Sequence, residues 1–294
     1  MTSQNSLLTG NDQPLKGIGL ICLAVLLFAS HDALSKFLSG IYPIVLVVWA
    51  RYVVHTLLML VVFVPRSGFS SIVRTRRPGL QLLRAVCLIG TSLLFTTGLR
   101  YIPLAEATSV NFLAPLLVTA LSVVVLGEKV TRSQWLAVLG GFVGVLIVVR
   151  PGGDLFTPAI LFPLGSALCF GIYQLITRKL SDIDSPTTSN FLAGIFNSLI
   201  MTALLPFFWV TPDWLHALFM IGLGTCGMLG HLLLTKAFLH AAPAMLAPFS
   251  YGQILFAGMY GYLIFDHTPD AWALTGIGVI CLSGLAVAWG QRRR

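Results

Sequence analysis

Long runs of apolar residues, separated by short clusters of charged residues, proline and glycine, make up the hydropathy pattern of this chain. A bilayer core of roughly 30 Å requires about 20 apolar residues in one α-helix. Division of the chain at its polar clusters predicts ten such runs. The expected spans are 17–38, 43–64, 80–99, 104–126, 133–149, 159–180, 189–210, 214–238, 243–265 and 271–289. This pattern predicts an all-α integral membrane protein with ten transmembrane helices.

Composition agrees with a chain solvated by lipid. Hydrophobic residues make up 56% of the chain and charged residues only 10%, whereas a soluble domain carries about 25% charged residues. The formal net charge is +8, but the basic residues lie in loops without interleaved aromatic residues, so nucleic acid is not expected as a partner. The five cysteines are scattered and form no CxxC pair, so no metal or cofactor is predicted. The expected partners are the lipid bilayer and a small-molecule substrate, and a homodimer stays open.

The distribution of lysine and arginine predicts the orientation in the membrane. If the N-terminus is cytoplasmic, thirteen of the eighteen basic residues fall on the cytoplasmic side. These are Lys16, Arg66, Arg74, Arg76, Arg77, Arg84, Lys129, Arg132, Arg178, Lys179, Arg292, Arg293 and Arg294. The outer side receives Arg100 and Arg150 together with four aspartates. We therefore expect a multi-pass inner-membrane protein with both termini in the cytoplasm.

The two halves of the chain resemble each other in sequence. Residues Phe28–Ser39 align with Phe170–Ser181 at an offset of 142 positions (170 − 28). Further along, spans four and five align with spans nine and ten at an offset of 137, for example through the pair Trp135 and Trp272. Each half contains an odd number of spans, so the second half is expected to be inverted. The predicted domains are five-helix repeats over 17–149 and 159–289, an arrangement that serves alternating access.

The stretch Pro103–Gly152 resembles the signature of EamA-type permeases of the drug/metabolite transporter superfamily. The resemblance lies in an A-E-A-T entry to span four, Pro115 within that span, a G-E-K-V turn and a glycine-rich fifth span. Trp49–Arg51 is similar to an aromatic-x-Arg motif of the family, and Lys36 to a basic residue that ends span one. The resemblance implies ten helices, a central cavity between the halves, and secondary transport or exchange of small organic molecules. The second half is most similar to S-adenosylmethionine-uptake-type members, although Tyr251 departs from that pattern.

Two ionisable residues, His31 and Asp32, lie within the first predicted span. Such groups at membrane depth cost about 2.5–3.5 kcal/mol on insertion scales, so each requires a reason. They can contact a substrate or carry a coupled proton, because an imidazole titrates near neutral pH. Alternatively, Asp32 and Lys36 form a structural pair, since they are four residues apart on one helix. Their repeat counterparts, Tyr173 and Gln174, complete a polar lining that suits an amphipathic or zwitterionic ligand.

Arg51 lies deep in span two beside Trp49, and it has two interpretations. Its guanidinium can bind a substrate carboxylate or phosphate in a bidentate manner, or it can brace span two against neighbouring carbonyl groups. Other polar residues on spans four, eight and nine either line the cavity or form interhelical hydrogen bonds. These further candidate substrate-binding residues are Asn111, His231, Tyr251 and Gln253.

Three further residues are expected to shape or gate the cavity. Glu106 is a candidate gating residue near the start of span four, and Glu128 is expected to support the cytoplasmic turn after that span. Pro115 can open a local bend beside the cavity.

A secondary transporter is the function that the pattern favours, with substrate and direction open. The substrate classes are S-adenosylmethionine-like, amino-acid-like, and cationic or zwitterionic compounds, and a multidrug or metabolite exporter is the alternative within the superfamily. An intramembrane enzyme is disfavoured because no HExxH or GxSxG motif occurs. A channel is disfavoured because no filter-like segment or charged ring is present in the sequence.

Overall fold

The computed structural model describes residues 14–127, 130–150, 152–153, 156–180, 183–240 and 243–292, which are helical with short connections and contain no β-strand. The elements of the first half are α1 (Pro14–Ile41), α2 (Ile44–Ser67), α3 (Phe69–Val73), α4 (Pro78–Leu99), α5 (Leu104–Asn111), α6 (Ala114–Leu126) and α7 (Arg132–Val149). Those of the second half are η1 (Pro158–Ile160), α8 (Leu161–Leu180), α9 (Pro186–Leu204), η2 (Leu205–Phe207), α10 (Trp214–His240), α11 (Pro243–Ser250), α12 (Gly252–Phe265) and α13 (Ala271–Arg292).

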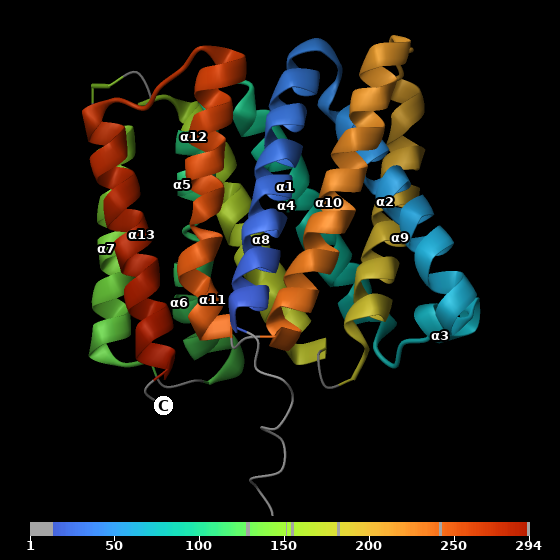
Figure 1. The fold of residues 1–294 in the computed structure, drawn as a ribbon, viewed down its shortest axis with the longest axis horizontal. Coiled ribbons are helices and arrows are strands. Elements are labelled where there is room, and N and C mark those ends of the chain that lie inside the picture. The colour runs from blue at the N-terminus through green and yellow to red at the C-terminus, as the bar shows by residue number, and fades with distance from the viewer. Residues whose placement is uncertain are drawn as a thin grey trace, which may run out of the picture.

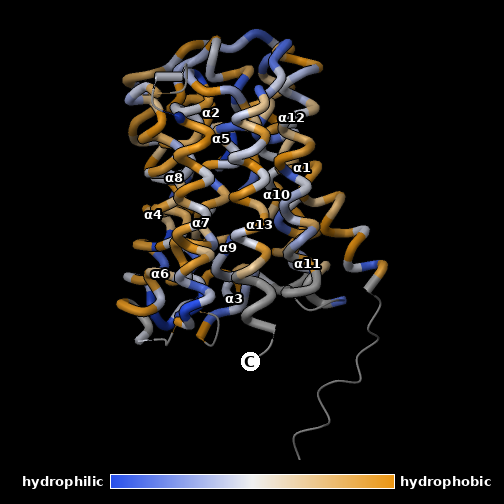
Figure 2. Tube along the Cα trace, turned by 90° about the vertical axis from the view of Figure 1, so that its left-hand side faces the viewer, coloured by the Kyte–Doolittle hydropathy of each residue, from blue (hydrophilic) through white to orange (hydrophobic). Residues whose placement is uncertain are grey.

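The long helices lie side by side in one bundle (Figure 1). The start of α1 and the end of α13 lie at the same end of this bundle, which we call the α3 end; the opposite end is the η2 end. Hydrophobic residues cover most of the length of the helices, whereas hydrophilic residues gather at the two ends (Figure 2). This distribution is the one that a bilayer imposes on helices that cross it.

Among the described residues, eight segments are long and apolar enough to cross a membrane. Seven of them are single helices or a helix with its adjoining 3-10 turn, and the eighth joins α5 and α6 as Leu104–Val124. A shorter apolar helix covers Ala271–Ala286 within α13. The all-α, multi-pass membrane class predicted from the sequence is therefore confirmed.

One helical pass in each half is interrupted near its middle. In the first half, α5 ends at Asn111 and α6 begins at Ala114, with Pro115 in the first turn of α6. Proline is tolerated there because the first-turn N–H groups of a helix have no intrahelical partner. In the second half, α11 contains Pro248, and α12 begins after Tyr251. The interruptions occupy corresponding places in the two halves.

The contacts between helices follow the same plan in both halves. Helix α1 packs against α10 and α12, and its counterpart α8 packs against α4 and α6. Two helices of the first half contact their own counterparts, α2 with α9 and α7 with α13. The pattern of contacts is therefore preserved when the helices of one half are exchanged with those of the other.

Helices α7 and α13 contact each other through glycine. A Cβ atom placed on Gly276 of α13 would lie 2.6 Å from the carbonyl oxygen of Gly144 on α7 and 2.8 Å from the backbone nitrogen of Val148. These backbones are therefore as close as small residues permit, which is how helices associate in a bilayer. The pair forms one flank of the bundle (Figure 1).

Candidate functional site

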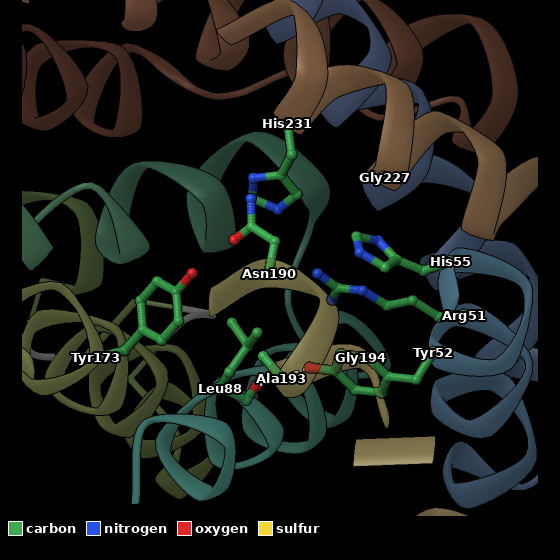
Figure 3. A pocket seen from close by; sticks show the side chains of 10 residues that line it. All are labelled: Arg51, Tyr52, His55, Leu88, Tyr173, Asn190, Ala193, Gly194, Gly227 and His231. Atoms are coloured by element: carbon green, nitrogen blue, oxygen red, sulfur yellow. Dashed lines mark hydrogen bonds between the residues drawn. The ribbon is translucent and has the colours of Figure 1, made fainter. Parts of the chain in front are cut away.

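A pocket with about 380 Å³ of empty space, its open mouth included, lies between the two halves. Helices α2 and α4 of the first half and α8, α9 and α10 of the second half contribute its walls. Figure 3 shows the side chains converging on this space from opposite sides. The lining residues are Arg51, Tyr52, His55, Leu88, Tyr173, Asn190, Ala193, Gly194, Gly227 and His231. Of the residues predicted from the sequence to bind substrate, Arg51, Tyr173 and His231 lie here.

Arg51 extends from α2 into the pocket (Figure 3). Its Nη1 donates a hydrogen bond of 3.0 Å to Ser92 Oγ on α4, and its guanidinium carbon lies 5.3 Å from the centre of the Tyr52 ring. No ion pair involves Arg51 within the described part of the chain. The Tyr52 hydroxyl in turn hydrogen-bonds to Ser92 and to the carbonyl of Leu88. Residues Tyr52 and Ser92 therefore hold Arg51 at the wall while it faces the pocket.

A second arginine, Arg84, lies behind the pocket wall and was not predicted as a site residue. The sequence analysis counted Arg84 among the basic residues of the cytoplasmic side, but its side chain lies on α4 inside the bundle and is 1% exposed. Its guanidinium donates to Thr177 Oγ1 (2.7 Å), the Ser189 carbonyl (2.7 Å), the Tyr173 hydroxyl (2.6 Å) and Asn190 Oδ1 (3.3 Å). It also lies 4.5 Å from the centre of the Tyr173 ring. Arg84 thereby fixes two of the residues that line the pocket.

Two histidines contribute the opposite wall of the pocket. The rings of His55 on α2 and His231 on α10 lie 6.4 Å apart in an edge-on arrangement, and His231 also contacts the Phe28 ring at 5.0 Å. His231 was predicted from the sequence, whereas His55 was missed. The spacing of His55 could have revealed it, because residues four apart share one face of a helix and His55 follows Arg51 by four.

His31 and Asp32 of α1 are buried next to the pocket but do not line it. His31 Nδ1 lies 3.1 Å from Asp32 Oδ1, and Gln253 on α12 donates a 2.8 Å hydrogen bond to Asp32 Oδ2. A Cβ on Gly227, a lining residue, would lie 3.4 Å from the His31 ring. His31 Nε2 has no partner in the described part of the chain. The predicted Asp32–Lys36 pair is wrong, since both oxygens of Asp32 bind these other residues.

Lys36 binds backbone instead, at the η2 end of the bundle. Its ammonium donates to the carbonyls of Leu99 (2.5 Å) and Ile102 (2.9 Å) and lies over the Phe265 ring. It therefore holds α1 against the connection between α4 and α5. These carbonyls are available because they lie at the end of a helix, where no intrahelical donor reaches them.

Glu106 is buried on α5 at the same end, with 2% of its surface exposed. One of its oxygens accepts a 3.0 Å hydrogen bond from His267 Nε2 in the loop after α12, and the other has no partner within the described residues. The gating role expected of Glu106 stays a prediction. Glu128 lies outside the described residues.

The remaining predicted residues lie away from the pocket. Trp49 donates to Thr202 Oγ1 at 2.9 Å on an exposed part of the surface, and Asn111 accepts from Ser166 at 2.9 Å between α5 and α8. Tyr251 contacts the Phe112 ring, and a Cβ on Gly284 would overlap its hydroxyl. Gln174, on α8, is partly buried and is not a lining residue.

Hydrogen bonds close the bundle at the α3 end, beyond Arg84. Asp184, between α8 and α9, accepts from Thr75 Oγ1 (2.5 Å) and from Gln81 Nε2 (2.7 Å) at the start of α4. Gln81 also donates to Ser189 Oγ at 3.0 Å. Asp184 and Gln81 are both buried. This closure joins a loop of the second half to α4 of the first half.

A corresponding set of bonds closes the η2 end. The Tyr42 hydroxyl, between α1 and α2, hydrogen-bonds to His216 Nδ1 (2.8 Å) and accepts from the backbone N–H of Asp213 (3.1 Å) at the start of α10. Asp184 follows Tyr42 by 142 positions (184 − 42), the offset that relates the first span to its repeat. The two closures are therefore built from equivalent loops and equivalent helix starts.

Comparisons with known proteins agree with a duplicated chain. The EamA-like transporter family matches it twice, over residues 15–150 and 157–289. An S-adenosylmethionine uptake transporter from Rickettsia bellii is 27% identical over 277 residues, covering 94% of each chain. A riboflavin transporter from Vibrio cholerae is 27% identical and covers 92% of each chain. The pseudopaline exporter CntI of Pseudomonas aeruginosa is 26% identical, covering 92% of this chain and 95% of its own length.

A solved crystal structure resembles this chain along nearly its whole length. It covers 97% of this chain and 99% of its own, with a TM-score of 0.65 and 18% sequence identity. At that level of identity the likeness shows the fold alone.

Proposed function

Because this chain belongs to the EamA-like transporter family, we propose that it moves a small organic metabolite across the inner membrane by alternating access, with the pocket as its substrate site. The observation that carries this proposal is the position of the pocket. Its walls come from both halves of a duplicated chain, and polar side chains converge on it. Transporters of this kind bind their substrate at the interface between repeats. The chain is thus a multi-pass membrane transporter rather than an enzyme.

The proposal includes ten spans arranged as two inverted repeats over 17–149 and 159–289. Eight spans are supported by length and hydropathy. The other two are α11 with α12, which continue each other across Tyr251, and α13. The α3 end is then cytoplasmic together with both termini, because most lysines and arginines of the connections lie there.

Alternating access is supported by the two closures. In such a cycle the pocket opens to one side while the other side is sealed, and exchanging the conformations of the halves exchanges the sides. In this proposal the bonds of Asp184 break when the pocket opens to the cytoplasm, and the bonds of Tyr42 break when it opens to the outer side. An inverted repeat requires the two closures to be built from equivalent loops and helices.

The names of the relatives define the first compounds to test. Two of them are named for uptake of S-adenosylmethionine and transport of riboflavin, and one is named an exporter. We therefore take S-adenosylmethionine-like metabolites as the leading substrate class, with metabolite or drug export as the alternative. Both directions are tested in one system if flux is followed into and out of vesicles.

The test is flux through the purified protein in proteoliposomes. Labelled S-adenosylmethionine, riboflavin, amino acids and a cationic drug are supplied in turn, and both uptake and efflux are timed. We expect saturable flux of at least one compound, released chemically unchanged. His231→Leu, which alters the pocket wall, should reduce this flux, whereas His240→Leu on the same helix, outside the pocket, should not. Absence of saturable flux across the whole panel would count against the transport proposal.

A further inference from the structure

We propose that Arg51 binds an anionic group of the transported metabolite, a carboxylate or a phosphate, inside the pocket. This inference rests on the transport function proposed above and names the chemistry of its substrate. It is carried by the contrast between Arg51 and Arg84. Both arginines lie at membrane depth, but they differ in how many of their N–H donors have an acceptor in the protein.

Arg84 is an arginine whose hydrogen-bonding capacity is used inside the protein. A guanidinium has five N–H donors, and Arg84 reaches four acceptors while being almost completely buried. Its role is to hold α4 against α8 and α9. A further ligand has no space to reach it, because the residue is only 1% exposed.

Arg51 has the same donors, but within the described residues only Ser92 accepts from it. Its other close neighbour is the Tyr52 ring, which supports the flat face of the guanidinium and leaves its edge available. An arginine at membrane depth is expected to be paired with an anion or with carbonyl groups. A substrate that carries two anionic oxygens matches the paired N–H groups along that edge.

The charge of the surroundings favours an anion over a cation. Arg51 is the charged residue among those that line the pocket, and no acidic side chain occurs among these described lining residues. The carboxylate of Asp32 is nearby but is already bound by His31 and Gln253. The attraction between Arg51 and an anion is also strong here, because the surrounding bundle has a low dielectric constant.

The rest of the pocket suits an aromatic or apolar substrate body. The ring of Tyr52 lies beside Arg51, and Leu88 and Ala193 contribute aliphatic surface. Gly194 and Gly227 leave backbone without side chains at the wall. The ligand that fits this combination has an anionic group at one end and a flat or apolar group at the other.

Two pairs of probes that differ only in an anionic group test the inference. S-adenosylmethionine is compared with its decarboxylated form, and flavin mononucleotide with riboflavin, by calorimetric titration of the purified protein. A charge-assisted contact of this kind corresponds to a ratio of dissociation constants of about 10- to 100-fold. We expect that preference for the anionic member in at least one pair. Preference in the first pair alone identifies a carboxylate, and preference in the second pair alone identifies a phosphate.

Substitutions connect the preference to Arg51. Arg51→Gln should abolish the preference by weakening the anionic member and leaving its uncharged partner unchanged. Arg132→Gln removes an exposed cation at the start of α7 and controls for net charge. Unchanged binding of the uncharged partner by Arg51→Gln shows that this variant is folded.

Three results of the binding assay would overturn the inference. These are equal affinity within both pairs, equal weakening of both members by Arg51→Gln, and binding by none of the four probes. Saturable vesicle flux of an uncharged or cationic compound, without any anionic preference, would reject the anion site and leave the transport function standing. The two proposals therefore fail by different measurements.

Discussion

The bond between the Tyr173 hydroxyl and Arg84 is the sharpest test of the packing around the pocket. Tyr173→Phe removes the 2.6 Å hydrogen bond to Arg84 Nη2 and keeps the ring that lies 4.5 Å from the guanidinium carbon. The substitution opens no large cavity, because only an oxygen atom is lost. The effect is therefore confined to one hydrogen bond with a charged group.

The size of the effect follows from the burial of both partners. A hydrogen bond to a charged group contributes about 1.5–3 kcal/mol to the free energy of unfolding. Arg84 is 1% exposed, so water does not replace the lost acceptor. At roughly 2–4 °C per kcal/mol for proteins of this size class, the melting temperature should fall by roughly 3–12 °C.

The measurement is thermal unfolding of the detergent-purified protein, followed by tryptophan fluorescence. Tyr101→Phe is the matched control, since Tyr101 is 65% exposed. We expect almost no change for the control, and no additional loss when Tyr173→Phe is combined with Arg84→Met. Equal melting temperatures for Tyr173→Phe and Tyr101→Phe would refute the assigned role of this bond.

Three further predictions concern other parts of the molecule. Gly276→Ala should separate α7 from α13 and lower stability by about 1–3 kcal/mol, measured by thermal unfolding, whereas Gly278→Ala, with no atom near its added Cβ, should not. Asp184→Ala should speed labelling of Asn190→Cys by an impermeant thiol reagent from the α3 side, in vesicles of a cysteine-free background; an unchanged rate would contradict a closure there. The Ala273 N–H, assisted by Arg150, holds the pKa of the Asp270 carboxyl below its ordinary value. The contribution of the Asp270 carboxylate to the free energy of unfolding is therefore present above its unfolded pKa and is lost as pH falls through its folded pKa. Plots of the free energy of unfolding against pH for wild type and Asp270→Asn should therefore converge in acid.

The hydropathy pattern predicted the helices well because each bilayer crossing requires a long apolar run. The region around Arg51 could also be predicted, since an ionisable residue within such a run requires a function or a partner. The sequence did not predict that the span 243–265 would be divided into α11 and α12, because the apolar run continues through Tyr251.

The partners of the polar residues could not be predicted from one helix at a time. Asp32 and Lys36 are correctly spaced to pair, but the acceptors of Lys36 belong to the end of α4 and its following loop. Arg84 lies only six positions after the start of α4, so sequence position alone assigned it to the cytoplasmic surface. Its burial depends on polar groups from α8 and α9, which lie about 90–105 positions away.

The partners of Arg84 also constrain how the protein is assembled. All four acceptors belong to residues 173–190, whereas Arg84 belongs to the first half. During synthesis α4 enters the bilayer before these acceptors exist, so its guanidinium must stay near the lipid headgroups, which a long side chain close to a helix end can reach. Only when α8 and α9 arrive can Arg84 move inward without an unsatisfied charge. Insertion of the second half therefore completes the membrane integration of the first.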